Sequence, residues 1–138
     1  MRTPLPPVAV AVGFLDRVNR ADVAGLSTLM SDDHELKVFD EPPLTGRAVN
    51  AEAWAGYFAA FPDYVIYPHN IAADGETVAI LGHTTGSHLG LCDDAEADLT
   101  LIWLVRTKTG EALSWTLIED TPAHRSTYGL SGYDKTAT

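Results

Sequence analysis

The stretch from Tyr64 to Asp120 constrains the fold most, because it consists of strand-forming runs separated by tight turns. The pairs Asp74-Gly75 and Thr109-Gly110 are typical of hairpin turns between two strands. Strands joined by hairpins lie next to each other in an antiparallel sheet. The pattern predicts four such strands, at residues 64–72, 77–88, 97–107 and 112–120.

Helices are predicted mainly in the first half of the chain. Apolar residues recur at helical spacing over residues 8–20 and again after Asp22, a residue type that caps helices well. A strand at 34–39 is predicted next, followed by a third helix capped by Asn50. Four aromatic side chains share one face of that third helix, at the spacing i, i+3, i+4 and i+7: Trp54, Tyr57, Phe58 and Phe61.

This order of elements predicts the fold class. Helices grouped early and strands grouped late favour an α+β fold over an alternating α/β fold. Three N-terminal helices wrapped around a curved antiparallel sheet would enclose a cone that is open at one end. We therefore expect a single domain over residues 1–138, with flexible tails at 1–6 and about 128–138.

The predicted strand at 97–107 is apolar on both faces. Trp103 and Val105 alternate with Ile102 and Leu104, so both faces of the sheet carry large hydrophobic side chains here. A strand buried on both sides needs a cover on its second face. Because the three helices are assigned to the first face, we expect a second copy of the chain on the other, giving a homodimer through the outer sheet face.

Charge and composition restrict the partners. The formal net charge is -10, with 9 basic and 19 acidic residues, so the basic footprint that nucleic acids require is missing. The same charge opposes binding to an anionic membrane surface. The single cysteine, Cys92, excludes an intramolecular disulfide and fits a reducing compartment. We expect a cytoplasmic protein whose partner is a small apolar organic molecule rather than nucleic acid or membrane.

Several stretches resemble a known family. Phe58–Asp63, Ala73–Ala79 and Thr85–Gly90 are similar to the corresponding stretches of SnoaL-like polyketide cyclases, as are Leu44–Arg47 and the strand around Trp115. That family belongs to the superfamily of ketosteroid isomerase and nuclear transport factor two. The resemblance covers nearly the whole chain.

The resemblance implies a cofactor-free cyclase or isomerase that acts on an apolar, polyketide-like ketone in secondary metabolism, such as antibiotic biosynthesis. One departure concerns the mechanism. In the family the last-strand Trp is typically flanked by His or acidic residues, whereas here Ser114 and Thr116 flank Trp115. This departure argues against an aldol reaction and leaves room for a reaction governed by substrate folding, such as a pericyclic ring closure. The sequence leaves both an acid–base-assisted and a shape-driven ring closure open.

The last strand offers carboxylates for acid–base chemistry. Enolate formation needs a base close to the carbon acid, and an apolar wall tunes a carboxylate for that task. If Trp115 points into the cone, Glu119 does so as well by the period of two, and Asp120 points away. Glu119 and Asp120 are therefore candidate catalytic residues, and which of them faces the pocket stays open.

Histidines are the other catalytic candidates. His83 and His88 lie five positions apart, so in a regular strand they face opposite sides. His69 shares its parity with Tyr67 in the preceding strand. No tight ligand spacing occurs, so we expect neither a metal site nor a cofactor. The catalytic candidates are thus Glu119, Asp120, His88 and His83, and the predicted substrate-binding residues are Trp54, Tyr57, Phe58, Phe61, Tyr67, His69, Trp103 and Trp115.

Two other functions compete with the cyclase or isomerase. A hydrolase that opens an epoxide would use an Asp-Arg-Asp cluster, and neither Arg47 nor Arg106 completes one in the sequence. A non-catalytic module that binds an apolar ligand would need the same cone and no acid or base.

Overall fold

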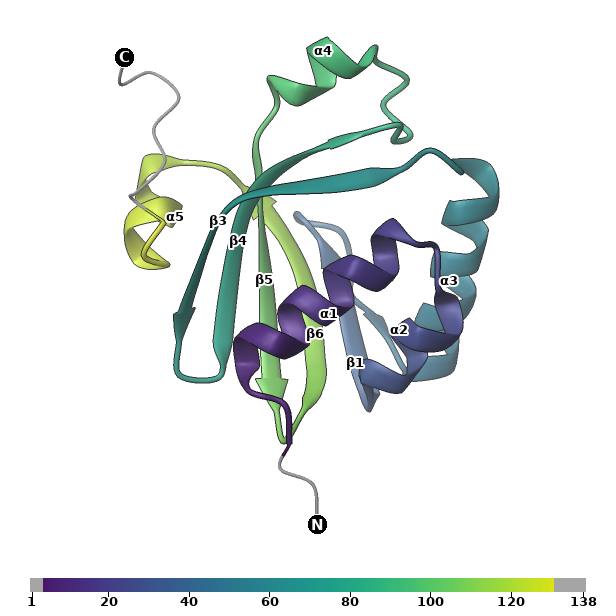
Figure 1. Cartoon of the computed structure of the whole chain (residues 1–138), viewed down its shortest axis with the longest axis vertical. Helices are drawn as coiled ribbons and strands as arrows, with labels where there is room; N and C mark the ends of the chain where they lie inside the picture. The colour runs from purple at the N-terminus through teal and green to yellow at the C-terminus, as the bar shows by residue number, and fades with distance from the viewer. Residues whose placement is uncertain (1–3, 131–138) are drawn as a thin grey trace.

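The chain forms a curved six-stranded sheet with helices on both sides, seen in the computed structural model of Figure 1, which describes residues 4–130. The elements follow in the order α1 (Pro7–Asn19), α2 (Val23–Leu29), β1 (Met30–Val38), β2 (Leu44–Thr45), α3 (Arg47–Ala60), β3 (Val65–Asp74), β4 (Thr77–Thr85), α4 (Asp93–Ala97), β5 (Leu101–Lys108), β6 (Glu111–Glu119) and α5 (Pro122–Thr127). The predicted α+β class is confirmed.

The first residues of the N-terminal helices are of types that favour the start of a helix. Pro7 occupies the first turn of α1, where its missing N–H costs nothing. The Asp22 side chain accepts a hydrogen bond of 2.9 Å from the Gly25 N–H, as predicted for the cap of α2. The prediction that Asn50 caps α3 is wrong, because that helix already begins at Arg47, after Gly46 with a φ of 114°. Asn50 is instead buried inside the helix.

Asn50 fixes α3 to the neighbouring strands. Its side-chain amide donates to the carbonyl oxygens of His34, Leu44 and Gly46 at 2.9–3.0 Å. These bonds join the start of α3 to β1 and β2. The carbonyls of His34 and Gly46 also accept backbone N–H groups, so the amide adds to an existing hydrogen-bond network at this junction. These hydrogen bonds explain why a polar residue occupies a fully buried position.

The sheet has the strand order β2-β1-β6-β5-β4-β3. The four strands predicted after Tyr64 form the antiparallel meander β3–β6, with Trp103 opposite Leu117 in the β5–β6 register. The first strand differs, since β1 pairs with β6 in parallel. The long path through β2, α3 and the meander brings β6 back beside β1, so the sheet is antiparallel except at this one pair.

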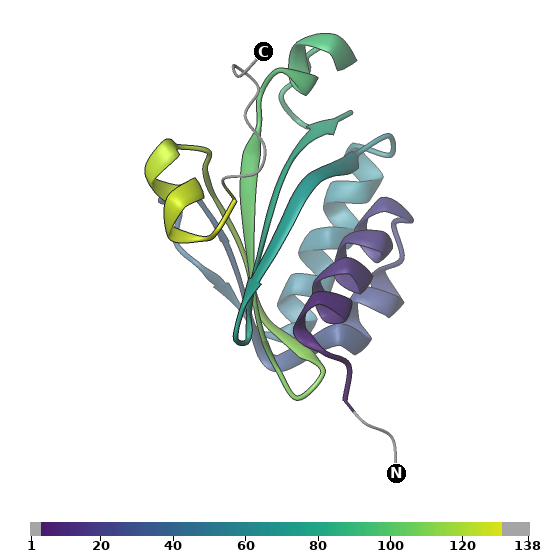
Figure 2. The same cartoon turned by 60° about the vertical axis from the view of Figure 1, so that its left-hand side comes forward.

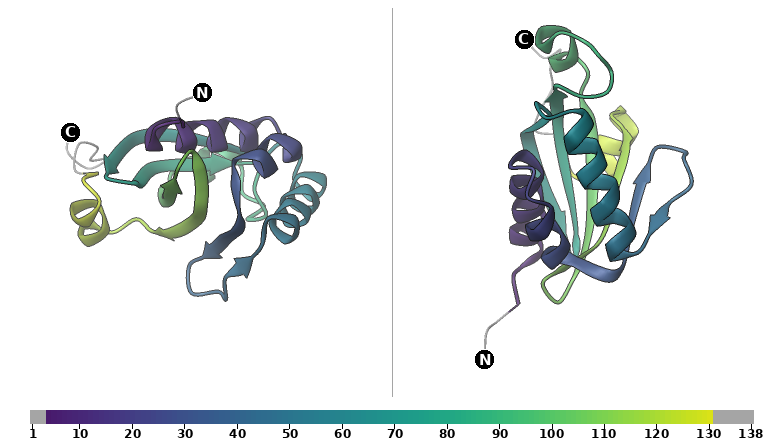
Figure 3. Two further views of the ribbon diagram at one scale, coloured as in Figure 1. Left: turned by 90° about the horizontal axis from the view of Figure 1, so that it is seen from below. Right: turned by 90° about the vertical axis from the view of Figure 1, so that its right-hand side faces the viewer.

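Helices α1, α2 and α3 all cover the concave face of the sheet, as predicted, and Figure 2 shows them on the opposite side from α5. Viewed from below, the sheet bends so that β1 and β2, with α3 beside them, turn away from β3 and β4 (Figure 3). The core between the helices and the sheet includes Phe14, Met30 and Trp103, each at most 1% exposed. This bend leaves the wide end of the cone unfilled by helices.

The outer face of the sheet has a cover that the sequence pattern did not predict. Leu130, completely buried, packs after α5 against Ala79, Leu81 and Ile102. The prediction of a dimer assumed that every helix lies on the concave face. That assumption is wrong, because α5 lies on the outer face. The homodimer through this face stays a prediction. The predicted flexible tails fall largely on residues 1–3 and 131–138, which lie outside the described residues.

Two further elements escaped prediction: the two-residue strand β2 and the helix α4, which lies in the segment 89–96 interpreted as an irregular connection. Within residues 4–130, no helix combines the length and apolarity needed to cross a membrane.

Replacing Leu130 by Ala tests the cover of the outer face. We expect the free energy of unfolding to fall by about 2–3 kcal/mol in urea denaturation, because the change leaves a cavity against the sheet. Leu91→Ala is the matched control, since Leu91 is 42% exposed and its truncation should cost less than about 0.5 kcal/mol. Equal stability of the two variants would contradict the packing of the C-terminal segment.

Candidate functional site

Two adjoining cavities occupy the concave side of the sheet. The inner one, called the inner chamber, has a volume of about 220 Å³, and the outer one, called the mouth, about 620 Å³. Five residues belong to both walls: Val38, Tyr57, Tyr64, His88 and Leu117. The inner chamber is lined by Leu36, Val38, Ala53, Trp54, Tyr57, Tyr64, His88, Trp103, Trp115 and Leu117.

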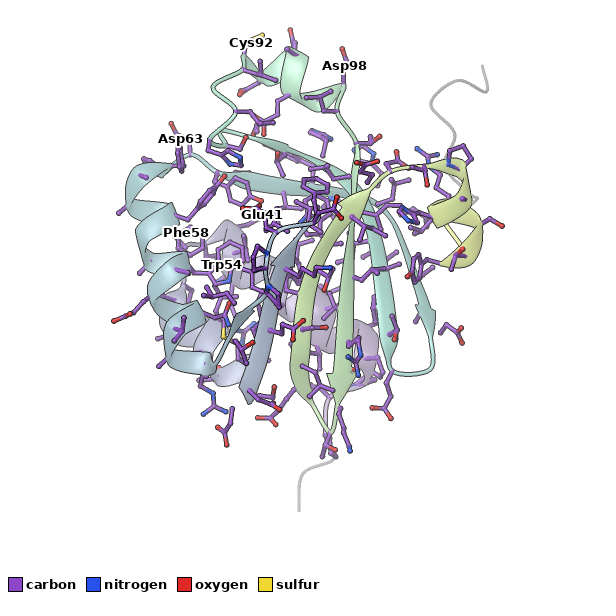
Figure 4. All side chains as sticks on the ribbon, turned by 180° about the vertical axis from the view of Figure 1, so that it is seen from behind. Glu41, Trp54, Phe58, Asp63, Cys92 and Asp98 are labelled. Carbon is purple, nitrogen blue, oxygen red and sulfur yellow. The ribbon has the colours of Figure 1, made fainter. Side chains whose placement is uncertain are left out.

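The inner chamber is aromatic because three elements direct their rings to one place. The alternation along β6 turns Trp115 and Leu117 to the concave face, and β5 turns Trp103 the same way. Helix α3 contributes Trp54 and Tyr57 from its inner side, and Figure 4 shows Trp54 between that helix and the sheet. Four of the predicted substrate-binding residues thus line the chamber: Trp54, Tyr57, Trp103 and Trp115.

The other predicted binding residues from α3 lie behind the wall. Phe58 is 8% exposed and stacks on Trp54, with ring centroids 5.4 Å apart, so it belongs to the core. Phe61 contacts Tyr57 and His88, with centroid distances of 4.8 and 6.1 Å, but does not line either cavity. The four aromatic residues therefore have two roles: Trp54 and Tyr57 line the inner chamber, and Phe58 and Phe61 pack against them from behind.

Tyr67, His69 and His83 are a correction to the predicted site. His83 has the strand parity of Leu81, which belongs to the outer core, so it faces away from the cavities. Tyr67 stacks on it at 4.8 Å. An irregularity in β3 between Pro68 and Asn70 brings His69 Nε2 to 2.7 Å from His83 Nδ1. These three side chains form an outer-face cluster and line neither cavity.

His88 lies in the loop after β4 and forms a pair with Tyr57. The Tyr57 hydroxyl lies 2.8 Å from His88 Nδ1 and accepts the backbone N–H of His88 at 3.2 Å. Because the phenol oxygen already accepts that N–H, its own proton is available to Nδ1. Burial raises the pKa of Tyr57, the His88 N–H opposes this, and the charge of Glu96 raises it again. Tyr57 is thus a neutral hydrogen-bond donor at pH 7.

Glu96, which the sequence analysis did not select, is the buried carboxylate of the mouth. It is 1% exposed and accepts hydrogen bonds from the Thr84 hydroxyl and, at 3.4 Å, from the Ser87 N–H. Its charge also reaches Tyr64, whose pKa is raised well above the ordinary range by burial first and by Tyr57 and Glu96 next. Three acidic residues within 93–96 are typical of the first turn of a helix, and α4 could have been predicted from them.

Glu119 and Asp120 both line the mouth but differ in their surroundings. Glu119 is exposed at the rim, with the parity of Trp115 and Leu117 as predicted. Asp120 accepts two hydrogen bonds of 2.7 Å from Arg125 in α5, and the Thr100 hydroxyl donates to it at 2.5 Å. The hydrogen bonds from Arg125 lower the pKa of Asp120, and Thr100 acts in the same direction against burial. Asp120 is therefore ionised and anchors α5.

The narrow end of the cone is closed by Phe14. Its ring stacks on Trp115 at 4.5 Å and on His34 at 5.6 Å. His34 Nδ1 lies 2.7 Å from the Ala112 carbonyl oxygen, and because a carbonyl only accepts, Nδ1 carries the proton. Burial lowers the pKa of His34, which keeps the ring neutral. Among the described residues, His34 Nε2 and the Trp54 indole N–H have no hydrogen-bond partner.

Metal ligands do not converge in the described part of the chain: residues 4–130 contain no group of three or more His, Cys, Asp or Glu side chains that could hold a metal ion.

A bent sheet with helices inside its curve is the architecture of the cystatin-like and nuclear-transport-factor-two-like folds. The chain belongs to the SnoaL-like domain family, whose sequence profile matches residues 11–119. No curated protein matches the chain in sequence.

Solved structures with this fold are similar to the chain at low sequence identity. A cystatin-fold protein from Novosphingobium aromaticivorans aligns over 83% of this chain and 99% of its own, with 15% identity and a TM-score of 0.71. A proposed polyketide cyclase from Sinorhizobium meliloti aligns over 82% and 94%, with 18% identity and a TM-score of 0.67. A proposed ketosteroid isomerase from Kribbella flavida aligns over 86% and 84%, with 18% identity and a TM-score of 0.60.

Asp120→Asn tests the structural role of that carboxylate. The lowered pKa means that ionised Asp120 stabilises the fold fully above the ordinary carboxyl pKa of about 3.9, and that this stability is lost as the pH falls through the lower folded-state pKa. We expect the variant to unfold about 2 kcal/mol more easily at pH 7, and the difference to shrink towards pH 3, in urea denaturation.

The control for that prediction is Asp40→Asn, because Asp40 is exposed in the loop after β1. A D120N protein as stable as the wild type but inactive would instead place Asp120 among the catalytic groups.

Proposed function

We propose that this protein is a cofactor-free cyclase or isomerase of an apolar, polyketide-like ketone. The observation that carries the proposal is an aromatic chamber that opens directly onto a buried carboxylate, Glu96, and a tyrosine–histidine pair, Tyr57–His88. Membership of the SnoaL-like family supports the same kind of reaction.

The chamber would hold the apolar body of the substrate. Trp54, Trp103 and Trp115 offer flat faces, which bind conjugated or polycyclic molecules by apolar contact and ring stacking. Because the chamber is continuous with the mouth through Tyr57 and His88, a molecule longer than the chamber places its far end among the polar groups.

The polar groups supply a base and an acid. Glu96 takes a proton from a carbon next to the substrate carbonyl. The electron pair of that C–H bond forms the C=C bond of the enolate, and the π pair of the carbonyl moves to its oxygen. The Tyr57 hydroxyl then turns its single proton away from His88 Nδ1 and donates it in a hydrogen bond to the resulting oxyanion. In an isomerisation, protonated Glu96 returns the proton to a second carbon; in a ring closure, the enolate carbon attacks a second carbonyl carbon, whose oxygen receives the proton.

Glu119, the leading candidate from the sequence, suits the base less well. An exposed carboxylate is well hydrated, whereas a base that works best at neutral pH is partly removed from water.

Hydrolysis is the second candidate function, and one observation favours it. Asp98 and Asp120 line the same mouth, and Arg125 binds Asp120, so the structure brings to this site an arginine that the sequence analysis had not considered. Epoxide opening also requires an acid that protonates the epoxide oxygen. The lowered pKa of Asp120 makes it a poor proton donor, which ranks this function below the first.

Glu96→Gln tests the proposed base. Gln keeps the shape, its amide oxygen accepts the Ser87 N–H and its NH2 group faces the Thr84 hydroxyl oxygen, but it removes no proton. We therefore expect turnover to fall by about 100-fold or more while binding of uncharged ligands is retained. The protein is incubated with a panel of polyketide-like ketones and polyenes, bound species are detected by native mass spectrometry, and released products are separated by chromatography.

The control is Glu76→Gln, in the exposed β3–β4 hairpin at the opposite end of the sheet (Figure 1). Loss of turnover in Glu119→Gln but not in Glu96→Gln would move the base to the rim. A product heavier by one water would favour the hydrolase, and ligands returned unchanged by the wild type would favour a non-catalytic binding module.

A further inference from the structure

The charges around the mouth are of one sign. Its lining includes five acidic side chains and, among the described residues, no lysine or arginine. Asp120 is balanced by Arg125 behind the wall, at 2.7 Å. The acidic residues come from three separate segments, so the shared sign is a property of the assembled site: Glu41, Glu96, Asp98, Glu119 and Asp120.

Among these acidic residues, Glu96 carries the charge whose burial costs the most free energy. Its side chain is buried, and its two hydrogen-bond donors, the Thr84 hydroxyl and the Ser87 N–H, are neutral. None of the ion pairs among residues 4–130 includes it. A carboxylate taken out of water without a cation loses hydration that neutral donors replace only in part. Glu96 lines a cavity, so a ligand can supply the missing cation.

The inner chamber suits a cationic ligand as well. Aromatic faces attract organic cations through their negative π-surface, and the attraction grows where water is excluded. Tyr57 lines both cavities and Trp54 lines the inner chamber (Figure 4 shows Trp54, Glu41 and Asp98 on this side of the molecule).

We propose that the natural ligand is an organic cation: an apolar, ring-containing ketone with a protonated amine, whose body fills the inner chamber and whose ammonium group lies near Glu96, beside the carbon whose proton Glu96 removes. This inference rests on the proposed function and specifies its substrate class. Anionic metabolites, such as free carboxylates and phosphate esters, are excluded by the same charges. The net charge of -10 adds a long-range field that attracts cations and repels anions.

Three naphthalene probes with the same ring system test the proposal by isothermal titration at pH 7: 1-naphthylmethylamine, 1-naphthalenemethanol and 1-naphthoate. We expect the amine to bind about tenfold more tightly than the alcohol, and the carboxylate to bind most weakly, because a charge beside a low-dielectric wall interacts more strongly than in water. The comparison needs only the wild-type protein.

Variants test which carboxylate balances the positive charge of the bound amine. In Glu96→Gln we expect most of the affinity difference between the amine and the alcohol to disappear, while the affinity of the alcohol itself changes by less than about twofold. Glu119→Gln, at the exposed rim, should reduce that difference only about twofold, since solvent screens that charge, and it guards against a folding defect in the first variant. Glu76→Gln should leave all three affinities unchanged.

The outcomes separate this inference from the proposed function. Equal binding of amine and alcohol would overturn the cationic ligand but leave the apolar chamber and its chemistry intact. Tightest binding of the carboxylate would overturn it as well. An amine preference that survives in Glu96→Gln would remove Glu96 as the counter-charge. Failure of all three probes to bind would contradict both the cationic ligand and the aromatic chamber on which the proposed function depends.

Discussion

The packing of Phe14 is the contact on which the rest of the molecule depends. Its completely buried ring joins four elements: it belongs to α1, stacks on Trp115 of β6 and His34 of β1, and meets the edge of Trp54 of α3 at 6.3 Å. These contacts close the narrow end of the cone. Because α1 is held there and the sheet bends away from it, the opposite end cannot be filled by helices, and the cavities follow.

The site combines two environments that one strand alone could not provide. The central strands and α3 supply flat aromatic surfaces, which exclude water from the inner chamber. The loops at the open end supply carboxylates, hydroxyls and His88, including the buried Glu96 delivered by α4. Loops can carry such groups because a rigid scaffold positions them without depending on them for its core.

Local sequence patterns predicted most of the scaffold and half of the chamber. Period-two alternation placed Trp103 and Trp115 on the concave face, and helical spacing placed Trp54 and Tyr57 on the inner side of α3. The same reasoning failed for Phe61 and His69. Periodicity identifies the face of an element but not how far along that face the cavity extends, and the irregularity in β3 changes the direction of His69.

The sequence by itself determined the α+β class, the order of the three N-terminal helices and the five long strands, the acidic character and the two apolar faces of the central sheet, because each depends on neighbouring residues or on composition. Only the tertiary structure decided the parallel β1–β6 pair, the packing of Leu130 on the outer sheet face, the ion pair between Asp120 and Arg125 and the burial of Glu96. The physical reason is that these features join segments whose approach depends on the bend of the whole sheet, and no local pattern encodes that bend.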